Sequence, residues 1–139
     1  MTELVKFERL FRKSLETIFL NFDIEKADEI LDNRDLTEFA DLWNVADEEI
    51  ENDLISLADK TQMDEARKEI FMWTLKQTSS SDLSAYISDD FDLIASHLLG
   101  RDKNYWVTSL CATYFDNKIP EGQLEITSKT LKELIDLKQ

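Results

Sequence analysis

Three pairs of carboxylates stand three residues apart in the chain, namely Glu25 with Asp28, Glu38 with Asp41, and Glu48 with Glu51. On a helix this spacing brings two side chains to one face, where they can share a magnesium ion. With 30 acids among 139 residues, such pairs also arise by chance. A metal-dependent helical nucleotide phosphohydrolase is therefore one alternative. A rise in melting temperature with millimolar magnesium or manganese would favour it.

Other catalytic chemistry has little support in the sequence. The chain has one histidine, His97, and one cysteine, Cys111, so it lacks the paired ligands of a zinc site. The run Asp89-Asp90-Phe91-Asp92 lacks the spacing and the glycine of a calcium loop. We expect Cys111 to be buried and His97 to lie at the surface near a helix end. The prediction is a protein that is not an enzyme, with no catalytic residue, metal or cofactor.

The acidic charge is concentrated in one part of the chain. The net charge is −14, and residues 23–53 alone contain 13 acids and two bases, a net charge of −11. Residues 1–22 are slightly positive, and we expect their basic side chains to face this acidic segment. Like charges at helical spacing destabilise a helix by a few tenths of a kcal/mol per pair, ~0.2–0.5. A solvated face is one interpretation of the segment, and a surface for a cationic partner is the other.

The candidate partner-binding residues follow from this charge. The first group is a run of acids with no lysine or arginine between them, Asp47, Glu48, Glu51 and Asp53. The second group is Asp89, Asp90 and Asp92. Tyr86 and Trp106 stand beside the expected inward rows of their helices, so they are candidate anchors of an interface, with a place in the core as the alternative. The expected partner is a basic protein.

Composition excludes several classes of protein. Two glycines and one proline are too few for the many turns of a β-sandwich or barrel, and a single cysteine excludes a disulfide framework. A strongly acidic chain repels phosphate, so we expect no direct contact with nucleic acid. Charged residues begin at Glu3, and no apolar run approaches the length of a signal peptide or a bilayer span. The expectation is a cytoplasmic protein that does not bind membranes.

Apolar residues recur at three- and four-residue steps along most of the chain. This pattern predicts an all-α fold, a compact bundle of seven to nine short helices in which residues 1–139 form a single domain. The expected helices are residues 2–21, capped by Thr2; 24–31, capped by Asp23; 36–43, capped by Asp35 with Glu38; 46–59; 61–74; 82–87; 89–98, capped by Ser88; 103–116; and a last one capped by Ser128. Gly100 is expected to be a left-handed residue at a helix end, and residues 123–126 are expected to be extended.

The segment Ser88–Ile94, followed by Asn104-Tyr105-Trp106 and residues 114–120, is similar to the C-terminal parts of helical bacterial immunity proteins. These are the acidic partners of toxins from polymorphic and contact-dependent growth-inhibition systems. The resemblance implies a protein-binding inhibitor that neutralises a cognate basic nuclease toxin by covering its active site. A DNA mimic or adaptor that binds a DNA-binding protein is a further alternative.

Overall fold

The computed structural model describes all 139 residues, which form seven α-helices, two short 3₁₀ turns and no strand. The predicted all-α fold is confirmed, with a helix count at the lower end of the expected range. The α-helices are α1 (Glu3–Leu20), α2 (Ala27–Asp35), α3 (Thr37–Glu48), α4 (Leu57–Thr78), α5 (Ser81–Leu99), α6 (Tyr105–Phe115) and α7 (Leu131–Lys138), and the 3₁₀ turns are η1 (Ile24–Lys26) and η2 (Asn52–Leu54).

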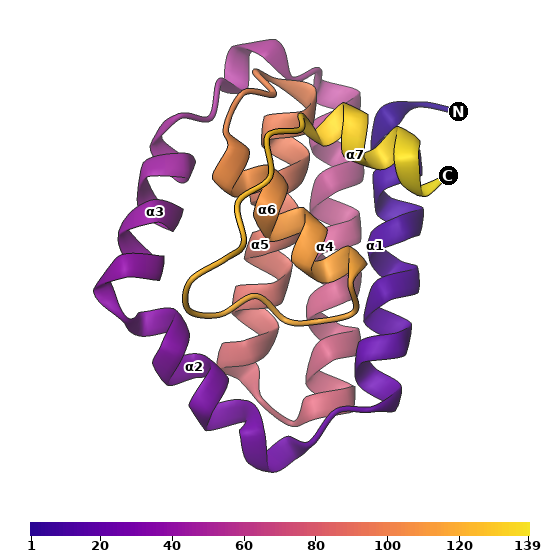
Figure 1. Ribbon diagram of the computed structural model, residues 1–139. Coiled ribbons are helices and arrows are strands. Elements are labelled where there is room, and N and C mark those ends of the chain that lie inside the picture. The colour runs from indigo at the N-terminus through magenta and orange to yellow at the C-terminus, as the bar shows by residue number, and fades with distance from the viewer.

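The three longest helices, α1, α4 and α5, lie side by side and form the frame of the molecule (Figure 1). Helices α4 and α5 run in opposite directions and are joined by only two residues, Ser79 and Ser80. Helix α6 packs on α1 and α5, and α7 packs on α1 and α6. All seven helices contribute side chains to one core of 30 buried apolar residues.

Helices α2 and α3 form an angular arm along one edge of this frame, which we call the α2–α3 arm (residues 27–48) (Figure 1). The chain runs up the arm from the end of α1 to η2, where it returns to the frame as α4. Helix α3 buries only Phe39 and Ala46 completely. The arm is therefore the least embedded part of the helical structure.

Helix α1 forms as its sequence predicts. The Thr2 hydroxyl accepts a hydrogen bond from the Val5 amide, which satisfies one of the unpaired N–H groups of the first turn. The predicted apolar row is buried, with Phe7 and Phe11 fully enclosed. Two of its basic side chains pair away from residues 23–53, Lys6 with Glu3 and Arg12 with both Glu8 and Glu69 of α4.

The predicted helix over residues 46–59 is wrong. Helix α3 ends at Glu48, and α4 begins only after Ser56, whose hydroxyl accepts a hydrogen bond from the Asp59 amide. The residues between them carry several carboxylates in succession, which repel one another in a helix. Ser56, which can cap a new helix, then follows. The chain accordingly turns here through η2 instead of continuing as a helix.

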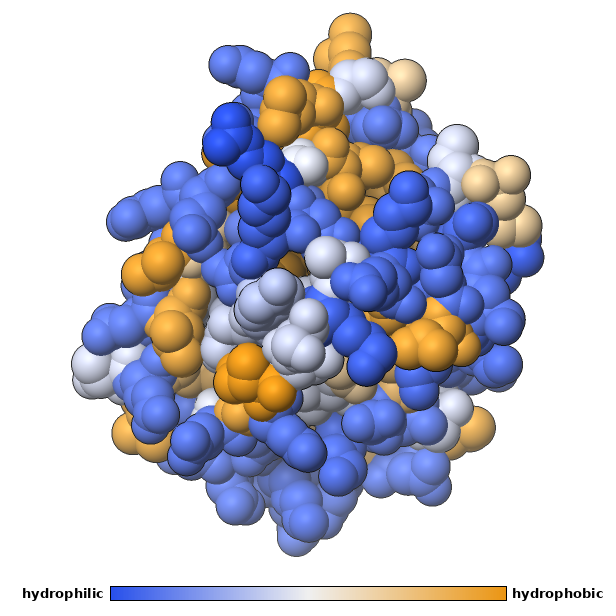
Figure 2. All heavy atoms as spheres, turned by 45° about the horizontal axis from the view of Figure 1, so that its top comes forward, coloured by the Kyte–Doolittle hydropathy of each residue, from blue (hydrophilic) through white to orange (hydrophobic).

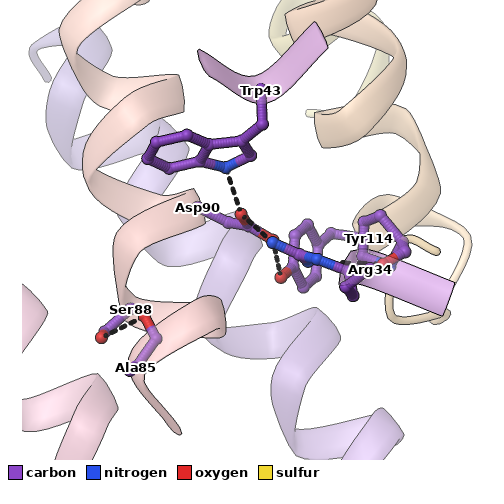
Figure 3. A network of polar contacts seen from close by, with 7 residues as sticks. Arg34, Trp43, Ala85, Ser88, Asp90 and Tyr114 are labelled. Atoms are coloured by element: carbon purple, nitrogen blue, oxygen red, sulfur yellow. Dashed lines mark hydrogen bonds and ion pairs between the residues drawn. The ribbon is translucent and has the colours of Figure 1, made fainter. Parts of the chain in front are cut away.

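The predicted break at Ser88 is also wrong, because α5 is continuous from Ser81 to Leu99 and is capped by Ser80. The Ser88 hydroxyl donates to the Ala85 carbonyl oxygen within the same helix (Figure 3). This internal bond satisfies the hydroxyl without ending the helix. Consequently, Asp89 and Asp90 lie in the middle of α5 and not in a first turn.

Four smaller predictions differ from the structure. Asp35 is the last residue of α2 and does not cap α3, and Thr130, not Ser128, caps α7 in a capping box with Glu133. Gly100 has a φ of −99° and is not left-handed. A Cβ atom there would lie 2.9 Å from the Ser96 carbonyl oxygen, so glycine is required by close approach. Residues 123–126 form irregular backbone without a paired strand.

Candidate partner-binding surface

A buried ion pair holds the α2–α3 arm against the frame (Figure 3). Arg34, near the end of α2, donates from Nη1 and Nη2 to the two carboxylate oxygens of Asp90, at 2.6 and 2.7 Å. Two other helices complete the shell of Asp90. The Trp43 indole of α3 donates to it at 2.9 Å, and the Tyr114 hydroxyl of α6 at 2.6 Å. We call these four residues the Asp90 network.

The carboxylate of Asp90 has all its partners although it lies out of contact with water. Asp90 is 0% exposed and Arg34 5%, and the Arg34 guanidinium also stacks over the rings of Phe39 and Tyr86. Burial alone would lower the pKa of Arg34, but the attraction of the Asp90 carboxylate outweighs it and the pKa is raised. Arg34 therefore stays charged, and it contributes no positive charge to the outer surface.

Little in the sequence predicts this network, since its members are far apart along the chain. One signal was present. If α5 is taken as continuous, Asp90 lies on the same face as Ile87 and Ile94, which are buried. A carboxylate in such a row needs a cationic partner. The prediction placed Asp90 among surface acids because it broke the helix at Ser88.

The first group of candidate residues lies where the arm meets the frame, around the end of α3 and η2. Asp47, Glu48 and Asp53 are exposed and make no ion pair. Glu51 is the only one of the four that forms an ion pair, with Arg101 at 3.0 Å. These carboxylates are therefore available to a partner.

The second group divides between surface and interior. Asp89 and Asp92 are half-buried on α5, whereas Asp90 belongs to the buried network. Burial raises the pKa of Asp92, and the positive charge of Arg67 partly offsets this rise. The neighbouring carboxylates of Asp64, Asp89 and Asp47 raise the pKa further. The charge of Asp47 thus acts on Asp92. The fold brings the two groups, which are far apart in sequence, within electrostatic range of each other.

The two aromatic candidates have different positions. Trp106 is buried and packs edge-on against Phe39, with ring centroids 5.2 Å apart. It therefore belongs to the core, which was the alternative to a place at an interface. Tyr86 is half-buried, and its hydroxyl donates to Asp35. This hydrogen bond, followed by partial burial, raises the pKa of Tyr86, so the phenol keeps its proton and remains a donor.

Tyr86 also borders a cavity of about 220 Å³ between the arm and α5. We call this cavity the arm pocket; it is lined by Arg34, Asp35, Phe39, Ala40, Trp43, Asn44, Tyr86 and Asp89. Asp35, Trp43 and Asn44 carry no sequence signal of a site, because only the folded arm brings them opposite α5. A larger open cleft of about 1090 Å³ lies between residues 17–30 and residues 109–128, and none of the candidate partner-binding acids lines it.

The face drawn in Figure 2 is mainly hydrophilic. Figure 2 shows predominantly polar residues with apolar ones in separate patches. Among the exposed apolar residues, Leu42 and Val45 of α3 are 41% and 51% accessible. The arm therefore presents apolar side chains among its carboxylates. No helix is long and apolar enough to cross a membrane.

The residues considered for catalysis are not assembled into a site. No group of three or more histidine, cysteine or acidic side chains is placed to hold a metal ion. Burial raises the pKa of Cys111 well above its ordinary value, so it is a neutral thiol, as expected for a buried cysteine. The surface prediction for His97 is wrong. Its ring is buried, and Nε2 lies 2.8 Å from the Ala46 carbonyl oxygen of α3.

Comparison with known families identifies the chain. The family model described as immunity protein PIM1 matches residues 5–121, which is most of the sequence. The chain belongs to the PIM1 family of immunity proteins. A search of curated proteins finds no match.

The match to the PIM1 immunity family extends from α1 through α6 and ends before α7. It includes the α2–α3 arm, all four members of the Asp90 network and both groups of candidate acids. The resemblance to immunity proteins seen in the sequence is thus confirmed at the level of the family. The family points to a protein-binding inhibitor and not to an enzyme.

Proposed function

We propose that this immunity protein neutralises a cognate toxin, a basic nuclease, by covering its active site with an acidic surface. We define this surface as residues 41–53 together with Asp89 and Asp92. The toxin would belong to a bacterial polymorphic or contact-dependent inhibition system, and the two proteins would meet in the cytoplasm, where nucleic acid is the toxin's target.

One observation carries the proposal. Residues 23–53 contain 13 acids and only two bases, and one of those bases, Arg34, is buried against Asp90. Lys26 is the other, so it is the only base of the segment at the surface. The outer charge of this region is thus even more negative than its sequence total. A nuclease that binds phosphate presents the complementary charge.

Charge alone would give a weak complex, because exposed ion pairs contribute only about 0–1 kcal/mol each. Leu42 and Val45 supply exposed apolar area on the same arm, and burial of such area drives most protein association. The carboxylates would steer the toxin and occupy its phosphate sites, while the apolar side chains slow dissociation.

The test uses the domain of the cognate toxin, to be identified from the genes that flank this one. Three unpaired acids of the surface are reversed together in one variant, Asp47→Lys, Glu48→Lys and Asp53→Lys. We expect its Kd for the toxin, measured by isothermal titration calorimetry, to rise about a hundredfold or more, with loss of protection in a nuclease assay, because each rim pair lost weakens binding and each reversal adds repulsion.

A matched control separates location from total charge. It reverses three exposed acids on other elements, Glu16→Lys, Glu125→Lys and Asp136→Lys, and so changes the net charge by the same amount. We expect its Kd to rise less than about tenfold, since distant exposed charges are screened by salt. Equal losses in both variants would show that only total charge acts. No loss in the first variant would place the interface elsewhere.

A further inference from the structure

The arm pocket has features that select a particular kind of side chain. Its aromatic rings are held in place by polar contacts. The Trp43 indole is fixed through its hydrogen bond to Asp90, and the Tyr86 ring through its hydroxyl on Asp35. Fixed aromatic faces of this kind bind flat or cationic groups at little cost in conformational entropy.

The charges around the pocket favour a cation. Asp35 and Asp89 lie in its lining, and each uses only its Oδ1 atom, toward Tyr86 and Arg67 respectively. The Oδ2 atom of each accepts no hydrogen bond within the chain. Asp35 is exposed and has no ion pair. Two carboxylate oxygens are therefore free to accept hydrogen bonds from an occupant.

Arg34 in the lining does not make the pocket an anion site. Both of its terminal nitrogens donate to Asp90, and Nη1 also reaches the Pro120 carbonyl oxygen at 3.3 Å. The side chain is buried and its charge is compensated by the bidentate pair. An anion would meet a guanidinium whose charge Asp90 already compensates, together with the two carboxylates of Asp35 and Asp89.

The size of the pocket fits a long side chain. A water molecule takes up about 30 Å³ of the liquid, so a cavity of about 220 Å³ holds considerably more than one or two ordered waters. Arginine suits this space better than lysine. Its planar guanidinium stacks on aromatic rings and presents several N–H donors at once, whereas an ammonium group is compact and strongly hydrated.

We propose that the arm pocket receives an arginine side chain of the cognate toxin, with its guanidinium against Trp43 and Tyr86 and hydrogen-bonded to Asp35 and Asp89. This proposal rests on the proposed function, and it names the anchor of that interface. The arginine would come from the basic surface of the toxin, because the arm around the pocket carries the complementary charge.

The first test needs no toxin. The full-length ¹⁵N-labelled protein is titrated with N-acetyl-arginine methylamide and, separately, with the citrulline analogue, which has a similar shape but no charge. We expect a saturable shift of the Trp43 indole N–H signal with the arginine compound only; Trp43→Phe assigns that signal. An equal response to citrulline, or no response at Trp43, would overturn the proposal.

Matched variants locate the effect. Asp35→Asn removes the charge but keeps an acceptor for Tyr86, and Asp32→Asn removes an exposed acid of the same helix that does not line the pocket. We expect Asp35→Asn to weaken binding of the arginine compound by about threefold or more, and Asp32→Asn to leave it nearly unchanged. Equal effects of the two variants would contradict a specific site.

The same pair of variants is then measured with the toxin. We expect the Kd to rise about tenfold for Asp35→Asn, because this change removes the carboxylate that faces the desolvated guanidinium in the unaltered protein. We expect the Kd to change little for Asp32→Asn. If the toxin binds Asp35→Asn as tightly as the unaltered protein, the pocket is not its anchor and the proposed function stands. If the unaltered protein does not bind or neutralise the toxin, the proposed function itself fails.

Discussion

Asp90 accepts four hydrogen bonds from three residues on three other helices, so its removal leaves several buried donors without a partner. We expect Asp90→Ala to lower the free energy of unfolding by about 3–5 kcal/mol, because Arg34 would remain buried as an uncompensated charge. Urea denaturation followed by tryptophan fluorescence measures this change.

The double variant Arg34→Met with Asp90→Leu provides the control. It replaces both charges by apolar side chains of comparable size, which is often nearly neutral for a buried pair. We expect a loss well below the sum of the two single losses. Additive losses would mean that the pair is not the main interaction of either side chain.

Asp92 leads to a prediction about pH. Its pKa in the folded protein is raised, first by burial and then by neighbouring carboxylates that oppose the attraction of Arg67. Folded Asp92 therefore holds its proton more tightly than the unfolded chain does. Its effect on stability is absent well below the ordinary aspartate pKa of about 3.9 and becomes destabilising as the pH rises past it.

We accordingly expect Asp92→Asn to raise the melting temperature at pH 7 and to change it little at pH 3. Differential scanning calorimetry at the two pH values measures this difference, and Asp136→Asn, at an exposed acid of α7, is the comparison. An Asp92→Asn variant that is less stable than the parent at pH 7 would show that its attraction to Arg67 is stronger than the cost of its burial.

At the level of single residues, the sequence predicts burial better than it predicts pairing. Cys111 is buried as expected, because it stands on a regular apolar row. Asp90 and His97 were assigned to the surface because polar side chains usually lie there. Their partners, Arg34 and the Ala46 carbonyl, are more than 50 residues away in sequence, and no local pattern reveals such contacts.

Among the helices, α7 depends on a residue from outside itself. The Asp102 carboxylate accepts hydrogen bonds from the Leu131 and Lys132 amides, at 2.7 and 2.9 Å, and so caps the first turn of α7 in addition to Thr130. We expect Asp102→Ala to cost about 1–2 kcal/mol of stability, as for loss of a helix cap.

Amide hydrogen exchange combined with urea denaturation tests this expectation. The amides of α7 should exchange faster in Asp102→Ala, while those of α4 change only through the global loss. Asp136→Ala, an exposed change within α7, controls for altered helix propensity. Unchanged protection of α7 would mean that Thr130 and its capping box are sufficient to hold the first turn.

Helices themselves were easier to predict than their ends. The regular apolar row of α1 and the cap at Thr2 agree with the structure because both signals are local. Serine is ambiguous in sequence, because it can either begin a helix or bond back within one. Ser88 could cap a helix but instead bonds back within α5, whereas Ser56 does cap α4 and was taken for the interior of a helix. Tertiary packing decides between these uses.

For the molecule as a whole, the sequence located the acidic charge but not the side on which it lies. That Asp47 and Asp92 act on each other follows only from the packing of the α2–α3 arm beside α5. The arm pocket was likewise invisible in the sequence, since its lining comes from three helices, and α5 contributes residues more than 40 positions beyond those of α2 and α3. Charge totals are additive along a chain, whereas surfaces depend on its folding.

The arrangement of the arm separates the residues that hold it from those that meet the solvent. Arg34, Phe39 and Ala46 point inward and secure it, while Asp47 and Glu48 point outward and make no ion pair. Substitutions at the outward positions therefore leave the anchoring contacts intact. The same framework can carry different sets of outward side chains, so under the proposed function its specificity for a toxin would diverge without a new fold.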